Sequence, residues 1–223
     1  MATAKTLRNP DEVIVPRPKI LKMLDAHNVP WKTWGMPGTT SRTLQDFFTY
    51  HEKDRFYLRN LRNGKHAGNG NNGHSNKFVI DVHAAIVIVK HRFNRKWFEL
   101  YEECQMFDGN PKPLVRSSFN GIAETACRTE KTMRASAMRC LAEELQICDP
   151  SKYELSECLK VEHREMMPSE KFPGVWAVYH RHIFECIISR SLFRKDGYAE
   201  REGIKTIYFK WKPASQIELQ LPP

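Results

Sequence analysis

The residue types and spacing best suited to chemistry lie in one short segment, Arg139-Cys140-Leu141-Ala142-Glu143-Glu144. On a helix, residues four apart share a face, so Arg139 can reach Glu143. The adjacent carboxylates of Glu143 and Glu144 are oxygen ligands suited to a hard divalent cation such as Mg²⁺. Such a cation bridges phosphate oxygens and activates water. The alternative is a Glu-Glu pair on the solvent face of an amphipathic helix, because glutamate is a good helix former.

The element that must position these side chains is the clearest helical pattern of the chain, over residues 131–147. Asp149-Pro150 is expected to end it, because proline cannot continue a helix. Apolar residues at helical spacing predict its buried stripe. The stripe consists of Met133 or Ala137, followed by Met138, Leu141, Leu145 and Cys148.

Strand patterns stand on both sides of this helix. They precede it at 56–59, 78–91, 96–107 and 114–119, and they follow it at 175–188 and 206–211. Shorter helices are predicted at 19–27, from a cap at Thr40 or Ser41 to about 51, and at 151–159. Strands around one long helix predict an α/β or α+β class with a mixed sheet.

The charge balance favours anionic partners. The 223 residues carry 35 Lys and Arg against 26 Asp and Glu, a formal net charge of +9. Such a surplus favours RNA, DNA or phosphorylated metabolites, although a basic surface that is simply solvated remains the alternative. The Gly- and Asn-rich stretch 60–76 is predicted to be a mobile loop, with Lys65, His66 and His74 touching phosphate as the alternative.

Several classes of protein are not expected from this sequence. No apolar run reaches the roughly 18–20 residues that cross a bilayer, and no hydrophobic signal core opens the chain, so we predict an intracellular, cytoplasmic protein without a membrane partner. The six cysteines form no C-x-x-C pair, which favours free thiols over structural zinc.

The segment around Arg139 resembles the Nudix box. That pattern runs Gly, five residues, Glu, seven residues, Arg-Glu, an aliphatic, any residue, Glu-Glu, any residue, Gly, an aliphatic. The matching positions are Arg139, Leu141, Glu143, Glu144 and Ile147. The resemblance implies an α/β/α sandwich with a mixed sheet, plus an N-terminal helical extension. It divides the chain into an arm with short helices (1–55), a Nudix-like domain (56–213) and a tail (214–223).

The same resemblance has four departures. Thr125 and Lys131 stand where the box has its first Gly and first Glu, Cys140 replaces the Glu after the arginine, and Gln146 replaces the closing Gly. Glu130 is the substitute for the missing first Glu if the loop is shifted by one residue.

The resemblance implies that Glu143 and Glu144, with Glu130, hold the metal and that Arg139 orients Glu143 by a salt bridge. A Cys140 thiol is a poor ligand for Mg²⁺, so binding of Mg²⁺ or Mn²⁺ is expected to be weak. A cysteine such as Cys140 is more commonly a small, buried apolar residue than a metal ligand.

A second group of candidates lies on the strand predicted after the helix. His180, Arg181 and His182 follow one another there, and the two histidines share one face of a strand, where they can contact phosphate. The alternative is that the histidines are structural and bond to backbone carbonyls.

Two functions follow from these features. The first is a divalent-metal-dependent hydrolase that cleaves a pyrophosphate bond in a nucleoside diphosphate derivative, with Glu144, Glu143 and Arg139 as its catalytic residues. The second is a catalytically silent protein of the same fold that binds RNA, a nucleotide or a protein assembly through its basic surface.

Overall fold

The computed structural model describes residues 15–37, 41–53, 55–59, 77–115, 121–127 and 130–214. Two compact units share the chain. Unit 1 comprises Met1–Ala84, Thr125–Met133 and Glu162–Arg181, and unit 2 comprises Ala85–Glu124, Arg134–Val161 and His182–Pro223. The domain boundary expected near residue 55 stays a prediction. The loop predicted at 60–76 and residues 215–223 of the tail lie outside the described residues.

Unit 1 contains the N-terminal helices α1 (Arg17–Ala26) and α2 (Leu44–Glu52), joined through a 3₁₀ turn at Trp31–Thr33. Helix α2 begins with a capping box, in which Thr43 accepts from the Asp46 N–H and Asp46 accepts from the Thr43 N–H. These bonds hold the pKa of Asp46 below its usual value. The expected cap at Thr40 or Ser41 is therefore wrong by two or three residues, because Asp46 pairs with Thr43.

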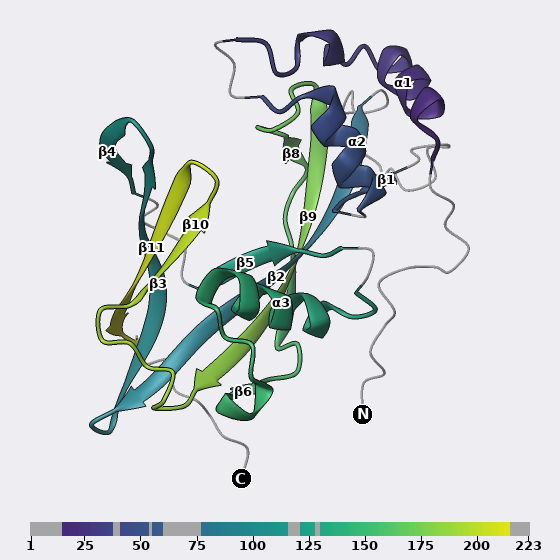
Figure 1. The fold of residues 1–223 in the computed structure, drawn as a ribbon. Coiled ribbons are helices and arrows are strands. Elements are labelled where there is room, and N and C mark those ends of the chain that lie inside the picture. Colours follow the sequence, from purple (N-terminus) through teal and green to yellow (C-terminus); the bar gives the residue numbers. More distant parts are fainter. Residues whose placement is uncertain are drawn as a thin grey trace. The chain divides into compact units, whose positions relative to one another are not determined.

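Aromatic side chains fill the core of unit 1. The Trp34 ring lies 5.3 Å from both Phe47 and Phe172, and its Nε1 donates to the Pro173 carbonyl at 3.0 Å. The buried members of this core are Ile20, Leu24, Val29, Trp34, Phe47, Phe48, Phe56, Phe78, Ile80, Val82, Phe172, Val175 and Ala177. Strand β1 (Tyr57–Arg59) pairs antiparallel with the start of β2 (Phe78–Phe93), beside α2 in Figure 1.

The sheet that supports the predicted site draws strands from both units. Its strand order is β10 (Tyr198–Glu202), β11 (Lys205–Pro213), β3 (Lys96–Phe107), β2, β9 (Val175–Ile188) and β6 (Tyr153–Leu155). The pairs β10·β11, β11·β3, β2·β3 and β6·β9 are antiparallel. The neighbours β2 and β9 run in the same direction in Figure 1, so the sheet is mixed. Strand β4 (Asn110–Leu114) pairs with β3, and β5 (Ile122–Thr125) pairs with β2.

The approach of β5 to β2 depends on a glycine. Gly121 has a φ of +99°, and a Cβ there would lie 2.4 Å from the Val87 carbonyl oxygen. Only glycine allows both that backbone conformation and that distance, so Gly121 lets the chain approach β2 closely just before β5 begins.

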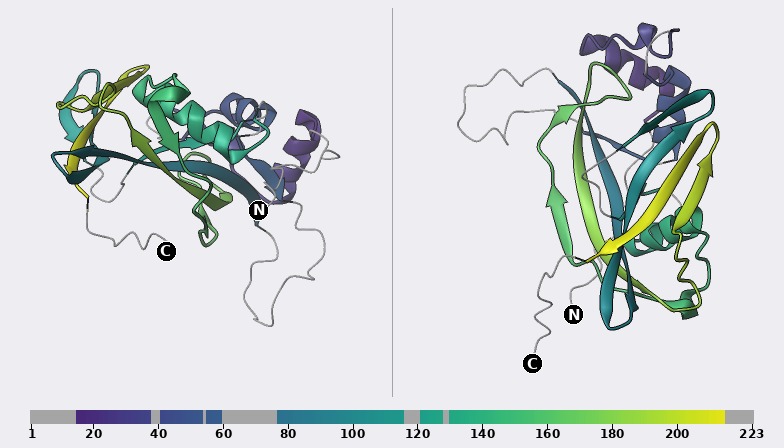
Figure 2. Two further views of the ribbon diagram at one scale, coloured as in Figure 1. Left: turned by 90° about the horizontal axis from the view of Figure 1, so that it is seen from below. Right: turned by 90° about the vertical axis from the view of Figure 1, so that its left-hand side faces the viewer.

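Helix α3 (Met133–Leu145) lies against one face of the unit 2 strands (Figure 2). The predicted stripe is correct at four positions and wrong at two. Met138 is 36% exposed because it lies one residue around the helix from the inward face, and Cys148 is exposed because it follows the helix end. The buried residues of α3 are Met133, Ser136, Ala137, Cys140, Leu141 and Leu145.

The helix predicted at 151–159 is also wrong. A 3₁₀ turn at Pro150–Lys152 leads into β6, whose Leu155 pairs with Cys186 of β9, so tertiary pairing overrides the local pattern. Of the strand predicted at 114–119, Leu114 is the last residue of β4, and residues 116–120 lie outside the described part. Short strands that the sequence did not predict are β5, β7 (Lys160–His163), β8 (Met167–Pro168) and β10.

The expected α/β class, with a mixed sheet and an N-terminal helical extension, is confirmed. In the described residues, no helix has the length and apolar character that a membrane crossing requires.

Candidate functional site

Arg139 joins two elements of unit 2. Its Nη1 donates to Glu143 one turn further along α3 at 2.8 Å, and it lies 3.5 Å from Glu124 of β5. The side chains of Arg139 and Glu124 are 19% and 17% exposed, whereas that of Glu143 is 49% exposed. Partial burial strengthens the Arg139–Glu124 attraction, so this arginine ties the last turns of α3 to β5.

Glu144 faces a different environment from its neighbour Glu143. Its pKa is raised from 4.5 to about 9, first by burial and then by a hydrogen bond to Glu200 and the charges of Glu200 and Glu124. The raised pKa favours the protonated form of the Glu144 carboxyl at neutral pH. Carboxylates held together out of water cannot both ionise cheaply.

The negative charge around Glu144 and Glu200 is only partly balanced by Lys205. Lys205 of β11 lowers the pKa of Glu144, but it also pairs with Glu202 at 2.5 Å. The Oε2 atom of Glu200 is buried and has no hydrogen-bond partner. An unpaired carboxylate oxygen out of water is destabilising, and such arrangements concentrate at functional sites. We call Glu124, Glu144 and Glu200 the carboxylate cluster.

Cys140 replaces the carboxylate that the Nudix pattern places after Arg139. The residue is 0% exposed, and its thiol pKa lies well above the usual value, first because of burial and then because of Glu144. The thiol stays protonated and packs as a small apolar group, which agrees with the alternative expected from the sequence.

The carboxylate cluster offers oxygen donors only. Carboxylate oxygens suit Mg²⁺ or Mn²⁺, and Mg²⁺ is commonly held by one or two carboxylates together with water and substrate phosphates. No group of three or more His, Cys, Asp or Glu side chains is arranged to hold a metal within the described ranges. Glu144 and Glu200 supply oxygen donors of the type that such a cation prefers.

The other predicted residues are divided between the two units. Glu130 belongs to unit 1, where its Oε2 accepts the Cys127 N–H at 3.0 Å. This hydrogen bond connects the Glu130 side chain to the backbone of the turn before α3. His180 and Arg181 also belong to unit 1, whereas His182 belongs to unit 2 with Arg139, Glu143 and Glu144.

His180 has defined partners in unit 1. Its Nε2 lies 2.9 Å from Asp81 Oδ1, its Nδ1 lies 2.8 Å from His163 Nδ1, and its ring stacks on His83 at 4.6 Å. The bonded partners of His180 are thus a carboxylate and a second imidazole. The neighbouring Arg181 is half-buried, and burial followed by the charge of Arg164 lowers its pKa.

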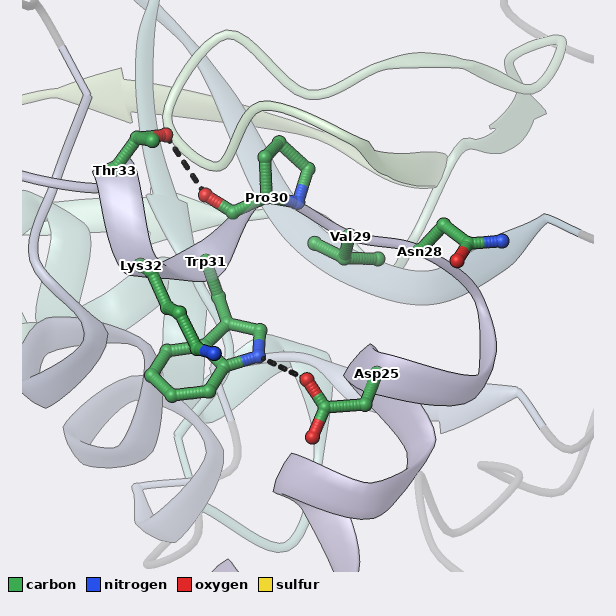
Figure 3. A pocket seen from close by; sticks show the side chains of 7 residues that line it. All are labelled: Asp25, Asn28, Val29, Pro30, Trp31, Lys32 and Thr33. Carbon is green, nitrogen blue, oxygen red and sulfur yellow. Dashed lines mark hydrogen bonds between the residues drawn. The ribbon is translucent and has the colours of Figure 1, made fainter.

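A separate pocket of unit 1 follows α1 (Figure 3). It has a volume of about 280 Å³ and is lined by Asp25, Asn28, Val29, Pro30, Trp31, Lys32 and Thr33. Trp31 Nε1 donates to Asp25 at 2.8 Å, and Thr33 donates to the Pro30 carbonyl at 2.8 Å. None of the residues predicted for chemistry lines this pocket.

Sequence reasoning missed Glu124 and Glu200. Glu124 lies on a strand of four residues, and Glu200 lies among other charges in Tyr198-Ala199-Glu200-Arg201-Glu202. Strands this short carry too little alternation to identify the face that a glutamate occupies. No signal in one sequence connects either residue to α3.

Comparison with solved structures finds Nudix proteins. The NUDIX domain of Shewanella oneidensis NrtR complexed with ADP ribose is 13% identical, covering 60% of this chain and 73% of its own, with a TM-score of 0.36. The C. elegans Ap4A hydrolase is 14% identical, covering 59% and 80%, with a TM-score of 0.34, and its binary complex gives 0.35. No family model and no curated protein matches the sequence.

Proposed function

We propose that this protein is a divalent-metal-dependent hydrolase of a pyrophosphate bond in a nucleoside diphosphate derivative. The supporting observation is the partly buried carboxyl of Glu144, whose pKa is raised by burial and by Glu200, beside the contacts of Arg139 with Glu143 and Glu124. A strongly raised carboxyl pKa beside a second carboxylate is typical of sites that bind a cation or transfer a proton.

Glu144 and Glu200 would hold the cation, and Glu143 would add a carboxylate at the exposed rim. A bound Mg²⁺ or Mn²⁺ would polarise phosphate oxygens and lower the pKa of a bound water. Arg139 is a positioning residue that fixes the rotamer of Glu143 through their 2.8 Å contact. Glu144 must release its proton before it can serve as a charged ligand, so the cation and the proton compete for this carboxylate.

The positive net charge of the protein favours an anionic substrate. A formal net charge of +9 raises the local concentration of phosphorylated molecules near the protein. The relatives named above include a complex with ADP ribose and an Ap4A hydrolase, and both ligands contain a pyrophosphate linkage between nucleosides or sugars. We therefore propose nucleotides of this type, with capped RNA as a larger member of the same chemical class.

The experiment is a hydrolysis screen of the full chain with ADP-ribose, Ap4A, nucleotide sugars and capped RNA, with Mg²⁺ or Mn²⁺. Phosphate released after phosphatase treatment is the readout. Glu144→Gln should remove turnover, whereas Glu154→Gln, the same change at an exposed position of β6, should retain it. Equal turnover in the two variants would refute the proposed site.

A nucleotide-binding protein without turnover is the second candidate. The buried thiol of Cys140 favours it, because one carboxylate of the family pattern is missing. In that case, calorimetry should detect nucleotide binding to a protein that releases no phosphate from any compound of the screen, and Cys140→Glu becomes the variant to test for gained turnover.

A further inference from the structure

Two exposed basic segments of unit 2 lie beside each other, away from the residues of the carboxylate cluster in the sheet. The first is the turn of the β2–β3 hairpin, residues 92–96, in which every residue is exposed. The second is the β9–β10 loop, in which residues 190, 191 and 194–196 are exposed. We call the residues 92–96 and 190–196 together the basic aromatic tip.

Aromatic packing fixes the two segments to each other. The Phe93 ring stacks on Phe193 at 5.8 Å with an interplanar angle of 17°, and Phe193 also stacks on His91 at 4.2 Å. His91 is 3% exposed and its Nδ1 lies 3.1 Å from the Ile188 carbonyl oxygen. The loop is held further by Trp211, whose Nε1 donates to the Arg194 carbonyl at 2.9 Å.

Phe93 remains 41% exposed despite this packing. Its ring therefore presents part of its surface to solvent at the end of the hairpin. Aromatic rings presented to solvent beside cations are the feature on which nucleic-acid bases stack.

The charge of the tip is strongly positive. Six cations, Arg92, Arg95, Lys96, Arg190, Arg194 and Lys195, stand against one acid, Asp196. Among the residues that the structure describes, no carboxylate forms an ion pair with any of the six. Arg92 lies over Trp97 at 5.9 Å and Arg194 over Tyr198 at 5.1 Å, so both guanidinium groups are oriented by aromatic rings.

The backbone of the turn supplies an independent observation. Arg95 has a φ of +63° and Asn94 a φ of +48°, as in a type I′ turn, where Asn-Gly is the preferred pair. An arginine is strained in this left-handed conformation, whereas glycine adopts it without strain. Retaining a strained cation where glycine would be more stable indicates that the side chain is used.

We propose that the basic aromatic tip binds single-stranded nucleic acid, with a base stacked on Phe93 and the exposed cations in contact with phosphates. The exposed part of the Phe93 ring favours unpaired bases, because bases in a duplex already stack on each other. The inference goes beyond the proposed hydrolysis and does not depend on it, because no residue of the carboxylate cluster belongs to the tip.

Fluorescence anisotropy of the full chain with labelled 20-nucleotide oligo(U) and oligo(dT) tests this proposal. We expect Phe93→Ala to weaken binding about tenfold, since one stacked base contributes about 1–3 kcal/mol. Tyr208→Ala, which removes a 38% exposed ring from β11, should leave affinity within about twofold. Arg95→Gly should lower the salt slope by about 0.7, the value for one lost phosphate contact on a single strand.

Measuring both stability and binding of the Arg95→Gly variant distinguishes a role of Arg95 in binding nucleic acid from a role in holding the fold. Arg95→Gly should raise the urea midpoint while weakening nucleic-acid binding, because glycine relieves the positive φ. Lys112→Gln, a loss of one exposed charge on β4, is the charge-matched control and should change affinity less. Tighter binding to a 20-base-pair duplex, equal binding to labelled polyglutamate, or equal losses for Arg95→Gly and Lys112→Gln would overturn the proposal.

Discussion

Glu143 and Glu144 show how the position of one residue on a helix decides its chemistry. Glu143 is exposed and balanced by Arg139, so its carboxylate stays close to water and to a cation. Glu144 points one residue further around the helix and meets Glu200, where burial raises its pKa to about 9. Of two adjacent glutamates, only Glu144 is held in a costly state, which is why it carries the proposed chemistry.

We expect Glu144→Gln to remove turnover and to stabilise the fold. Glutamine resembles the protonated acid and can donate to Glu200 without the cost of ionisation. At pH 8.5 the free energy of unfolding should rise by at least about 1 kcal/mol, the equivalent of one pKa unit. Urea unfolding measures this change. A variant less stable than the native chain at that pH would contradict the assigned environment of Glu144.

Arg139 offers a test of positioning. Arg139→Lys keeps the charge but loses the planar fork that serves Glu143 and Glu124 together. We expect Mn²⁺ affinity to fall about 10–100-fold, as is typical when a partner of a metal ligand is removed. Titration followed by electron paramagnetic resonance of free Mn²⁺ measures this, and Lys152→Arg at an exposed position is the control. Unchanged affinity in Arg139→Lys would remove Arg139 from the site.

Helix α3 ends at a position where the sequence lacks the usual residue. Gln146 has a φ of +59°, and the next residue, Ile147, is 2% exposed and donates its N–H to the Leu141 carbonyl at 3.0 Å. The chain therefore makes the same left-handed exit that a glycine would make, and glutamine is strained there. The end of the helix is preserved because burial of Ile147 compensates for this strain.

We expect Gln146→Gly to stabilise the protein by about 1 kcal/mol, because glycine adopts a positive φ without strain. The matched control is Gln45→Gly in the first turn of α2, which should destabilise by up to about 1 kcal/mol, because glycine is a poor helix former. Thermal unfolding of both variants measures the two changes. If both variants lose stability, the strain assigned to Gln146 is absent.

At the scale of the whole molecule, the raised pKa of Glu144 links stability to pH and to metal. The folded state binds a proton at Glu144 up to about pH 9, whereas an unfolded glutamate releases it near 4.5. Between these values the folded state holds more protons, so this group's contribution to stability falls as pH rises. A cation that replaces the proton should restore the loss.

We expect Mg²⁺ or Mn²⁺ to raise the melting temperature more at pH 8.5 than at pH 6, with release of a proton on binding. Differential scanning fluorimetry and calorimetry in buffers of different ionisation enthalpy measure the two effects. Glu144→Gln should show neither. A metal-induced shift that is the same at both pH values would show that the cation binds away from Glu144.

The sequence by itself determined the local features of this protein. The 3.6-residue spacing predicted α3 and the contact of Arg139 with Glu143, because both depend on neighbours within one or two turns. Alternating and apolar runs predicted the long strands β2, β3, β9 and β11. These patterns sufficed for the α/β class, since long elements with one buried face repeat their signal many times.

Only the tertiary structure decided what surrounds Glu144. Its partner Glu200 lies 56 positions away in the chain, on a short strand brought near by the pairing of β10 with β11. Burial, not residue type, raises the pKa of Glu144, and burial depends on strands whose few residues carry no distinct pattern. The Phe93–Phe193 stack likewise joins segments about 100 residues apart, and no local spacing encodes such long-range contacts.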